Sequence, residues 1–322
     1  TAAALPGDAS GARKTSRLHL VGSAQTRDDG SSDPCGPFMK WVGGKTRLLS
    51  QLEALLPAHI GGYLEPFVGG GAMYFHLRAA GRFERAVLAD YNHDVVNVWR
   101  TIRDDPDTLA ALLQIHERRY LRSDAEARAL YFYEVRGRHP IDHPEMGAAE
   151  RAARMLFLNR TCFNGLWREN AGGRFNAPHG RYPRPRIAQD DRIAADHRAL
   201  QATVIDQADF RRIPQLVAAN HVDFVYLDPP YHPISATSSF NAYSGGQFSG
   251  ADQADLAQVC RQLDSMGVRF VLSNSACELI RELYRGFELV EVWAPRAVSA
   301  RTSGRGSVTE LAIHNRRPGL SW

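Results

Sequence analysis

The sequence predicts an α/β protein built on a doubly wound sheet of mostly parallel strands. Between residues 62 and 92 a strand, a glycine turn, a helix and a second strand follow one another. The same alternation returns after residue 222, where the apolar stretch VDFVYL is typical of a central parallel strand buried on both faces. Strands alternating with helices in this way predict a parallel sheet covered by helices on both sides.

Length and composition place the chain among ordinary globular proteins. It has 322 residues, 44% hydrophobic and 23% charged, which allows one large domain with an insertion. The apolar runs are far shorter than a membrane span, and the N-terminal segment lacks a signal-like apolar core, so we expect a cytoplasmic protein. The four cysteines are far apart in the sequence, which predicts free thiols and no zinc site.

Charge adds one detail to this picture. The net charge of +4 predicts only a mild attraction to polyanions. All but three of the 39 basic residues are arginine, and the three lysines are Lys14, Lys40 and Lys45. Two of them stand in the short stretch KWVGGK, which makes that stretch conspicuous.

The elements can be assigned in chain order. Residues 1–37 lack a periodic apolar pattern and are predicted to be a disordered tail. A loop and a leucine-rich helix follow up to Pro57, then the strand, glycine turn and helix ending at Gly81, then the strand RAVLADYN. From 222 onward we expect the strand VDFVYLD, the helix ADQADLAQVCRQLDSMG, the strand VRFVLSN, the helix ELIRELYRG, and an antiparallel pair made by FELVEVW and VTELAIHN.

The middle of the chain breaks this alternation. Residues 95–188 are first helical and arginine-rich and then loop-like, without an internal repeat. We interpret them as an insertion into one discontinuous α/β domain formed by residues 38–94 and 189–316, with a short tail at 317–322.

The glycine turn EPFVGGGA, residues 65–72, is the first candidate site. Three glycines between a strand and a helix permit positive φ and a close approach of the backbone to a ligand. The turn fits neither G-x-G-x-x-G nor, at GGKT, the Walker pattern, so a nucleoside triphosphatase is disfavoured. A purely structural turn and a nucleotide-type ligand remain equally open on this motif alone.

Asp90 ends the second strand about 20 residues after the glycine turn. An acid at that place holds ribose hydroxyls in many doubly wound folds, and together with the glycine turn it favours an adenosine-containing cofactor. The alternative is that Asp90 caps the helix beginning near His93.

The tetrad DPPY, residues 228–231, follows the predicted central strand. Ligands bind at the carboxyl ends of such strands, and two prolines make the following turn stiff. Asp228 and the Pro229 carbonyl can accept the two hydrogens of a planar exocyclic amine while Tyr231 stacks on its base. The alternative is an ordinary turn in which Asp228 is a cap.

Seven blocks in order and register resemble the DNA adenine methylase (Dam) family of S-adenosylmethionine-dependent N6-adenine methyltransferases. The blocks are KWVGGK, EPFVGGGA, LADYN, FLNRTCFNGLWREN, FNAPHGRY, DPPYHPISATSSFNAY and SNS, and they span Phe38 to Asn315. The resemblance implies a Rossmann-like methyltransferase sheet, with residues 95–188 as a mainly helical DNA-recognition domain. It departs from the family at Phe163, where tyrosine is common, at the bulky Trp167 and in the tail 1–37, which puts the exact target sequence in doubt.

Carried over residue by residue, the resemblance implies roles for both substrates. The target adenine would be held by Asp228, Pro229 and Tyr231. S-adenosylmethionine would be bound by Trp41, Lys45, Glu65, Phe67, Gly69, Gly70, Gly71, Asp90, Asp209, Phe210 and Asp228. DNA would be contacted by Lys40, Asn159, Arg160, Phe163, Asn164, Leu166, Arg168, Pro178 and Arg181. The resemblance places on a hairpin that enters the duplex Asn159, Arg160, Phe163, Asn164, Leu166 and Arg168, and on its supporting loop Pro178 and Arg181. Phe163 would be a wedge and Arg168 would read guanine. Without the resemblance, CFNGLW is better explained as a hairpin tip packed on its own domain with an Asn-Gly turn.

The predicted function is methyl transfer to N6 of an adenine flipped out of a short site in double-stranded DNA, with GATC suggested by the resemblance. Methylation of adenine in RNA or of N4 of cytosine stays open, although Asp at the first position of the tetrad favours adenine. A catalytically inactive DNA-binding relative is the alternative from another class. No metal and no obligatory protein partner are implied, and we expect a monomer in the bacterial nucleoid or a phage-encoded enzyme acting in the host cytoplasm.

Overall fold

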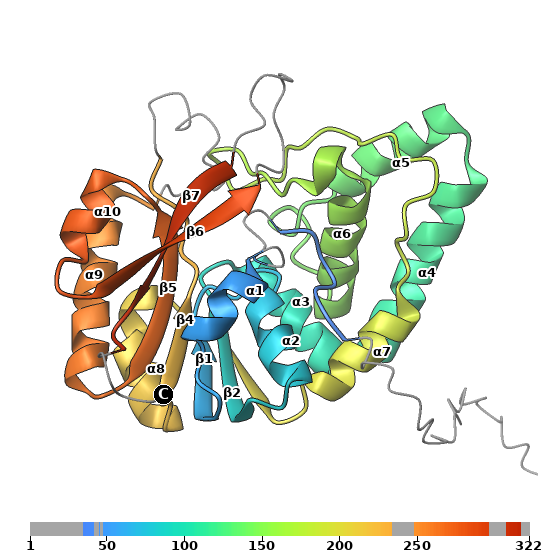
Figure 1. The fold of residues 1–322 in the computed structure, drawn as a ribbon. Helices are drawn as coiled ribbons and strands as arrows, with labels where there is room; N and C mark the ends of the chain where they lie inside the picture. The colour runs from blue at the N-terminus through green and yellow to red at the C-terminus, as the bar shows by residue number, and fades with distance from the viewer. Residues whose placement is uncertain (1–34, 42–44, 46–47, 234–247, 296–306, 317–322) are drawn as a thin grey trace, which may run out of the picture. The chain divides into compact units, whose positions relative to one another are not determined.

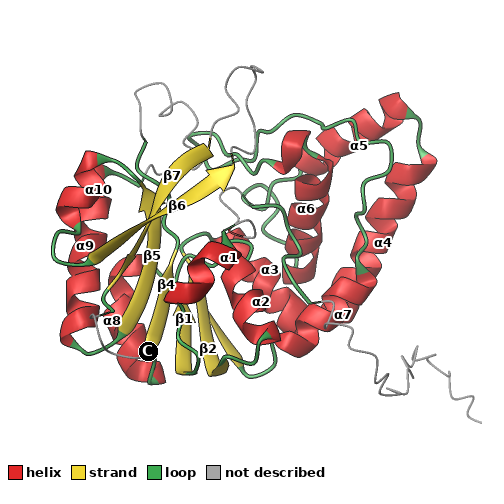
Figure 2. Cartoon of the chain, in the orientation of Figure 1, coloured by secondary structure: helices red, strands yellow, loops and turns green. Residues whose placement is uncertain are grey.

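The computed structural model describes residues 35–41, 45, 48–233, 248–295 and 307–316. Residues 1–34 and 317–322 of the two expected tails lie outside this part of the chain. Helices and strands alternate along it (Figures 1 and 2). No helix in the described ranges is long and apolar enough to cross a membrane.

A seven-stranded sheet forms the centre of the fold, in the order β3-β2-β1-β4-β5-β7-β6. The first five strands in this order run parallel, whereas β7 is antiparallel to both β5 and β6. The strands are β1 (Ile60–Glu65), β2 (Phe83–Asp90), β3 (Thr203–Gln207), β4 (Phe224–Leu227), β5 (Arg269–Ser275), β6 (Glu288–Pro295) and β7 (Ser307–His314). Because β1, β2 and β4 are parallel neighbours, the residues that follow them meet at one edge of the sheet.

Helices cover both faces of the sheet, as Figure 1 shows. Alternate residues of one strand enter different cores, so that Tyr63 and Tyr226 pack on one side and Leu64 and Val225 on the other. The first side is covered by α1 (Leu49–Leu52), η2 (Glu53–Leu55), α2 (Ala72–Ala79) and α3 (His93–Asp104), and the second by η4 (Phe210–Arg212), α8 (Ile213–Asn220), α9 (Gly250–Ser265) and α10 (Glu278–Leu283). Both faces of β4 are therefore buried, which explains its uninterrupted apolar run.

A group of helices is inserted between β2 and β3. It comprises α4 (Pro106–Arg122), α5 (Ala125–Gly137), α6 (Ala148–Thr161) and α7 (Asp190–Ala199). The helix α6 is buried along most of its length and packs on α3, α4 and α5. Residues 162–179 then form an irregular hairpin, with isolated bridges at Cys162–His179 and Glu169–Phe175 and the single turn η3 (Phe163–Gly165) near its base.

The predicted fold class is confirmed, as are the strands and helices assigned around the glycine turn and after residue 222. The elements between residues 189 and 221 were missed, namely α7, β3, η4 and α8. The helix expected after Lys45 is shorter than predicted, because α1 passes into η2 after one turn.

Candidate active site

The glycine turn is held between two tryptophans. Gly69 and Gly71 have φ values of +44° and +65°, a conformation that favours glycine. A side chain at Gly69 would meet the Trp41 ring, and one at Gly71 would meet Trp99. The Trp99 indole also donates a 2.9 Å hydrogen bond to the Gly69 carbonyl. Glycine is therefore required here both by conformation and by close packing.

Asp90 fastens this turn to the end of β2. One carboxylate oxygen accepts the Gly69 N–H at 3.0 Å, and the other accepts the Asn92 N–H at 2.9 Å. Burial raises the pKa of Asp90 to about 6, although these backbone N–H groups oppose the shift. The helix α3 is capped by Asn92, so the alternative in which Asp90 is the cap is wrong.

Glu65 lies beneath the glycine turn and is only 3% exposed. One of its oxygens accepts hydrogen bonds from the Tyr63 hydroxyl at 2.7 Å and from the Tyr74 N–H at 3.0 Å. Burial raises its pKa to about 8, so the carboxyl group is mainly protonated at neutral pH. Glu65 thus anchors the first turn of α2 without adding a full negative charge to the site.

Asp228 follows β4 at the same edge and forms an ion pair with Lys45, with 2.7 Å between Nζ and Oδ1. The side chains of the two residues are 20% and 5% exposed, respectively. Burial raises the pKa of Asp228, and the Lys45 charge opposes this rise. The Lys45 ammonium also lies 4.6 Å from the centre of the Tyr231 ring. The structure therefore brings together one lysine of KWVGGK with the acid and the aromatic residue of DPPY.

A hydrogen-bond network that the sequence analysis did not predict fixes the DPPY turn. Tyr231 donates to Glu310 at 2.6 Å. Gln253 donates to the Pro230 carbonyl at 2.9 Å and accepts from Asn274 at 3.0 Å. Of these three partners only Asn274 carried a signal, because it belongs to the block SNS.

An aromatic cluster stands beside the glycine turn. Phe67 stacks on Phe210 with ring centres 6.1 Å apart, and Phe248 contacts both rings at 6.0 and 5.2 Å. Asp209 caps η4 and pairs with Arg211. The structure thus joins Phe67 and Phe210, which are distant in sequence, and adds Phe248, which the sequence analysis missed.

The predicted wedge residue lies on an exposed turn. Phe163 is 52% exposed, and the Leu166 N–H donates to its carbonyl at 3.2 Å. Between them Asn164 and Gly165 have φ values of +55° and +65°, as Asn-Gly turns of this kind require. Gly165 is packed against the Lys40 side chain. The predicted Asn-Gly turn is present, but the Phe163 ring is not packed into the recognition helices.

Two predicted DNA contacts lie in a helix, not in the hairpin. Asn159 and Arg160 belong to the last turns of α6. Asn159 is fully buried. Its side-chain oxygen accepts the backbone N–H of Lys40 at 2.8 Å, and its side-chain nitrogen donates to the Lys40 carbonyl at 2.7 Å. The expectation that Asn159 lies on the hairpin is wrong, because the helix continues through it, and its side chain positions Lys40.

The remaining predicted DNA residues are spread along the hairpin and the loop behind it. Arg168 is exposed and donates to the Asn176 side chain at 2.6 Å. The Pro178 carbonyl accepts the Phe163 N–H at 2.8 Å, which ties the two arms of the hairpin together. Arg181, with φ of +55°, borders a cavity of about 360 Å³ next to α4 and α5.

Comparison with known proteins assigns this site to a class. Residues 41–298 match the model of the D12 class N6 adenine-specific DNA methyltransferases, and the chain belongs to this family. M.MjaIII, a type II methyltransferase of Methanocaldococcus jannaschii, is 37% identical over 286 residues, covering 87% of this chain and 98% of that protein. The type II methyltransferase M1.LlaDCHI of Lactococcus lactis is 38% identical over 286 residues, with 87% and 95% covered. A DNA adenine methylase of Serratia marcescens is 34% identical over 275 residues, with 85% and 96% covered.

The protein is therefore a site-specific DNA methyltransferase that acts on N6 of adenine, and membership of this family implies the use of S-adenosylmethionine. The site fits such a molecule. The glycine turn leaves its backbone close to any ligand, Phe67 belongs to an aromatic cluster beside that turn, and Asp90 lies at the end of β2, where doubly wound folds bind ribose.

Proposed function

We propose that the chain methylates N6 of an adenine flipped out of GATC in double-stranded DNA, with Asp228, Pro229 and Tyr231 holding the base. The observation that carries the proposal is the pairing of Asp228 with Lys45 at the sheet edge shared with the glycine turn. A carboxylate at this place can accept a hydrogen of the amine within reach of a cofactor at the turn.

The base is held by acceptors on one side and a ring on the other. Lys45 occupies Oδ1 of Asp228, which leaves Oδ2 to accept one hydrogen of the adenine amine, while the Pro229 carbonyl accepts the other. Tyr231, fixed by Glu310, stacks on the base. With both hydrogens engaged, the nitrogen lone pair is less conjugated with the ring and is directed at the electrophile, without a covalent enzyme intermediate.

For the cofactor, we propose binding by the residues that line the glycine turn and the sheet edge. S-adenosylmethionine supplies an electrophilic methyl group when bound. Trp41 and the backbone of Phe67 to Gly71 would line its pocket, Asp90 would hold the ribose, and Asp209 with Phe210 would flank the adenine. Lys45 would adjoin both substrates, whereas Glu65 would act through the turn above it.

Flipping would depend on Phe163, because an adenine inside a duplex cannot reach Asp228. The exposure of the Phe163 ring on a rigid turn supports a wedge between base pairs. With 2-aminopurine at the target position, the enzyme should increase fluorescence, and Phe163→Ala should give a smaller increase. An equal signal from both proteins would contradict the wedge.

The target sequence is tested on plasmid DNA. After incubation with the protein and S-adenosylmethionine, GATC-cutting enzymes that are blocked by adenine methylation should fail to cut, and those that require it should cut. Protection of other sites alone would refute GATC while retaining the reaction. Tight DNA binding without methylation would favour the inactive-binder alternative, and methylated-base mapping would separate adenine N6 from cytosine N4.

We also propose the arrangement in which this activity operates. Residues 38–94 and 189–316 would form the catalytic domain and residues 95–188 the target-recognition domain. A monomer would act on one strand at a time, in the cytoplasm of a bacterium or of a phage-infected host. Two relatives are named type II methyltransferases, which supports a restriction–modification setting.

A further inference from the structure

The two prolines of DPPY leave one angle of the turn open. Pro229 has its φ fixed by its ring, and the proline that follows confines its ψ to the extended region. Pro230 has a fixed φ too, but it is followed by Tyr231, so its ψ and the path of the chain into Tyr231 remain free to vary. Neither proline has an N–H, so between them the turn can be anchored only through a carbonyl. The direction of the Pro229 carbonyl and of the Tyr231 ring therefore depends on what holds Pro230.

Gln253 supplies that anchor from the first turn of α9. Its side-chain nitrogen donates to the Pro230 carbonyl at 2.9 Å, and the residue is fully buried. Since a carbonyl can only accept, the amide must present its nitrogen to Pro230 and its oxygen to the opposite side. On that side the nitrogen of Asn274 donates to it at 3.0 Å.

Asn274 continues this chain of hydrogen bonds to the other end of the turn. It is fully buried in β5, and its side-chain oxygen accepts the N–H groups of Ser275 at 2.8 Å and of His232 at 3.3 Å. Reversing either side-chain amide would bring two donors or two acceptors together. The two amides therefore hold the turn on both sides of Tyr231, and the turn cannot shift without breaking a buried hydrogen bond, which is costly.

The helix that carries Gln253 is itself fixed. Ser249 Oγ accepts the Asp252 N–H at 3.2 Å, and an Asp252 oxygen accepts the Ser249 N–H at 2.8 Å, which closes the start of α9. Arg211 bridges Asp252 and Asp255, with nitrogen–oxygen distances of 2.6 and 2.8 Å. Gln253 stands between these two carboxylates in the sequence, so its side chain extends from a rigid base and holds the turn in place.

We propose that Gln253, supported by Asn274, is a positioning residue for methyl transfer. By fixing Pro230 it directs the Pro229 carbonyl and the Tyr231 ring toward the extruded adenine, so that the amine is held in line with the methyl group. Gln253 acts through Pro230 and touches neither substrate. The inference rests on the proposed function, because it concerns the groups proposed there to hold the base.

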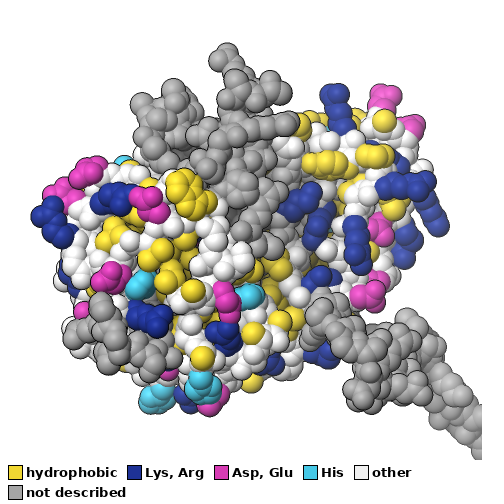
Figure 3. All heavy atoms as spheres, viewed as in Figure 1, with side chains coloured by type: hydrophobic (Ala, Val, Ile, Leu, Met, Phe, Trp, Pro, Cys, Tyr) yellow, Lys and Arg dark blue, Asp and Glu magenta, His cyan; other side chains and the backbone are white. Residues whose placement is uncertain are grey.

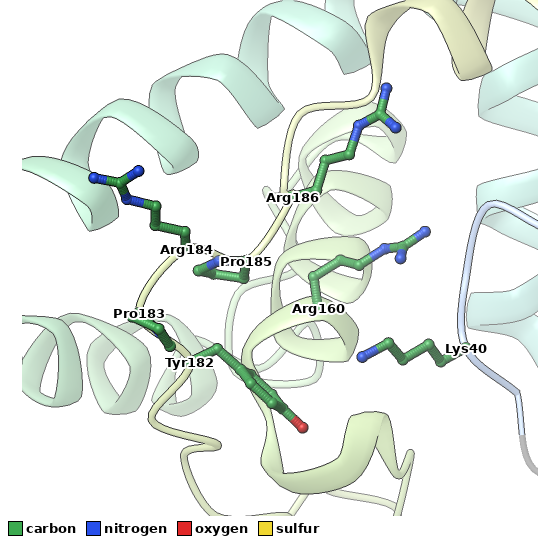
Figure 4. Close-up of a pocket in the computed structure, with 7 residues that line it drawn as sticks. All are labelled: Lys40, Arg160, Tyr182, Pro183, Arg184, Pro185 and Arg186. Carbon is green, nitrogen blue, oxygen red and sulfur yellow. The ribbon is translucent and has the colours of Figure 1, made fainter.

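The proposed DNA contacts belong to another part of the molecule. Basic side chains gather over the recognition helices on the face seen in Figure 3. Lys40, Arg160 and Tyr182 line a cavity of about 220 Å³, shown in Figure 4, together with the segment 183–186. Gln253 belongs instead to α9 and Asn274 to β5, on the sheet side. A change at Gln253 should therefore disturb the alignment of the reacting groups and preserve the affinity for DNA.

The test compares Gln253→Met with Gln258→Met. Methionine keeps the length of the side chain but cannot donate to Pro230. Gln258 is the matched control, because it lies on the same helix with its side chain exposed. The rate of methyl transfer in a single turnover, with enzyme in excess over a GATC duplex, should fall about 10- to 100-fold in Gln253→Met and stay at the wild-type value in Gln258→Met. The affinities of Gln253→Met for the duplex and for S-adenosylmethionine should match the wild type.

Two results would overturn the inference. One is a wild-type rate in Gln253→Met. The other is a loss of rate accompanied by an equal loss of both affinities, since Gln253 would then serve only the fold.

A second variant, Gln253→Glu, keeps the shape of the side chain. Its carboxyl group can donate to the Pro230 carbonyl only when protonated, and burial favours that neutral form. The ratio of its single-turnover rate to that of the wild type should therefore rise as the pH is lowered. A ratio near one at every pH, beside a slow Gln253→Met, would mean that the acid stays protonated and would equally support the donor. A ratio that stays low at every pH would contradict it.

Asp228→Ala separates this inference from the proposed function. If Asp228→Ala loses methyl transfer while Gln253→Met keeps the wild-type rate, the inference is wrong and the proposed clamp on the base stands. If Asp228→Ala keeps most of its turnover, the clamp itself is refuted and the inference falls with it.

Discussion

Replacing Lys45 by methionine should move the acid limb of the activity profile to higher pH. Methionine keeps the length of the side chain and removes its charge, so the carboxylate of Asp228 loses a partner at 2.7 Å. The pKa of Asp228 is already raised by burial, and Lys45 is the main influence opposing that rise. Removing the Lys45 charge should therefore raise the pKa of Asp228 further. More of Asp228 would therefore be protonated at neutral pH and unable to accept the amine hydrogen as an anion.

The magnitude follows from the geometry. The side chain of Lys45 is 5% exposed and that of Asp228 20%, so solvent screens the pair only partly. A shift of the limb by one pH unit corresponds to about tenfold in rate, or about 1.4 kcal/mol, wherever the profile falls on its acid side. Glu310 also raises the pKa of Asp228 by its charge, and it remains in the variant. We expect a loss of at least about tenfold near neutral pH.

The assay is the kcat/KM for a duplex oligonucleotide, measured from acid to alkaline pH at saturating S-adenosylmethionine. The activity of Lys45→Met should recover toward the wild type as the pH rises. Lys40→Met is the matched control, since Lys40 belongs to the same motif but contacts Gly165 and Tyr182 and not Asp228, so its profile should keep the wild-type limb. If Lys45→Met lowered kcat/KM by the same factor at every pH, the electrostatic reasoning would be refuted and Lys45 would act in substrate binding alone.

Three further changes test other parts of the site. Asp228→Ala should lower kcat by about 10²–10³-fold or more, with DNA affinity largely kept, because the carboxylate acts on the extruded base; retention of most turnover would exclude the clamp. Arg168→Ala should relax discrimination at one base position by about 1–3 kcal/mol in kcat/KM across singly substituted sites, and an unchanged preference would show that another residue reads that base. Glu65→Gln should reduce the loss of folding stability between pH 6 and 9. In the wild type the folded state keeps the Glu65 proton up to a pKa of about 8, whereas the unfolded chain releases it at lower pH. The free energy gained from this difference is lost as the pH rises through the folded pKa, and glutamine has no proton to lose. Urea midpoints at both pH values measure it, and parallel losses in the two proteins would contradict the raised pKa.

Much of the fold could be predicted because burial leaves a clear pattern in the sequence. The apolar run of β4 is continuous because both its faces are covered, and the glycines at 69 and 71 stand where a side chain would strike a tryptophan. The strand β3 was missed because it is short, lies at the edge of the sheet and exposes Val204. The helix α8 has only eight residues and begins beside Pro214, which obscures its period.

The site could be predicted where a motif carries its own chemistry, and not where a side chain acts through a partner distant in the sequence. DPPY identified Asp228, but nothing near it in the sequence indicates that Glu310 would fix Tyr231 or that Gln253 would hold the Pro230 carbonyl. Asn159 was expected to contact DNA because the family resemblance placed it on the hairpin. Its burial in α6 depends on packing that a local sequence does not encode.

The structure also explains why a lysine stands at position 45 in a chain whose basic residues are nearly all arginine. The ammonium of Lys45 is a compact charge that fits between one oxygen of Asp228 and the face of Tyr231, in a position that is 4% exposed. A planar guanidinium with five donors would need more acceptors and more room than this slot provides. The side chain of Lys40 packs against Gly165, where even an added methyl group would collide, and its ammonium lies 5.2 Å from the centre of the Tyr182 ring. Within one short motif, Lys45 therefore lowers the pKa of Asp228, the acid proposed to hold the base, whereas Lys40 packs on the turn that carries Phe163.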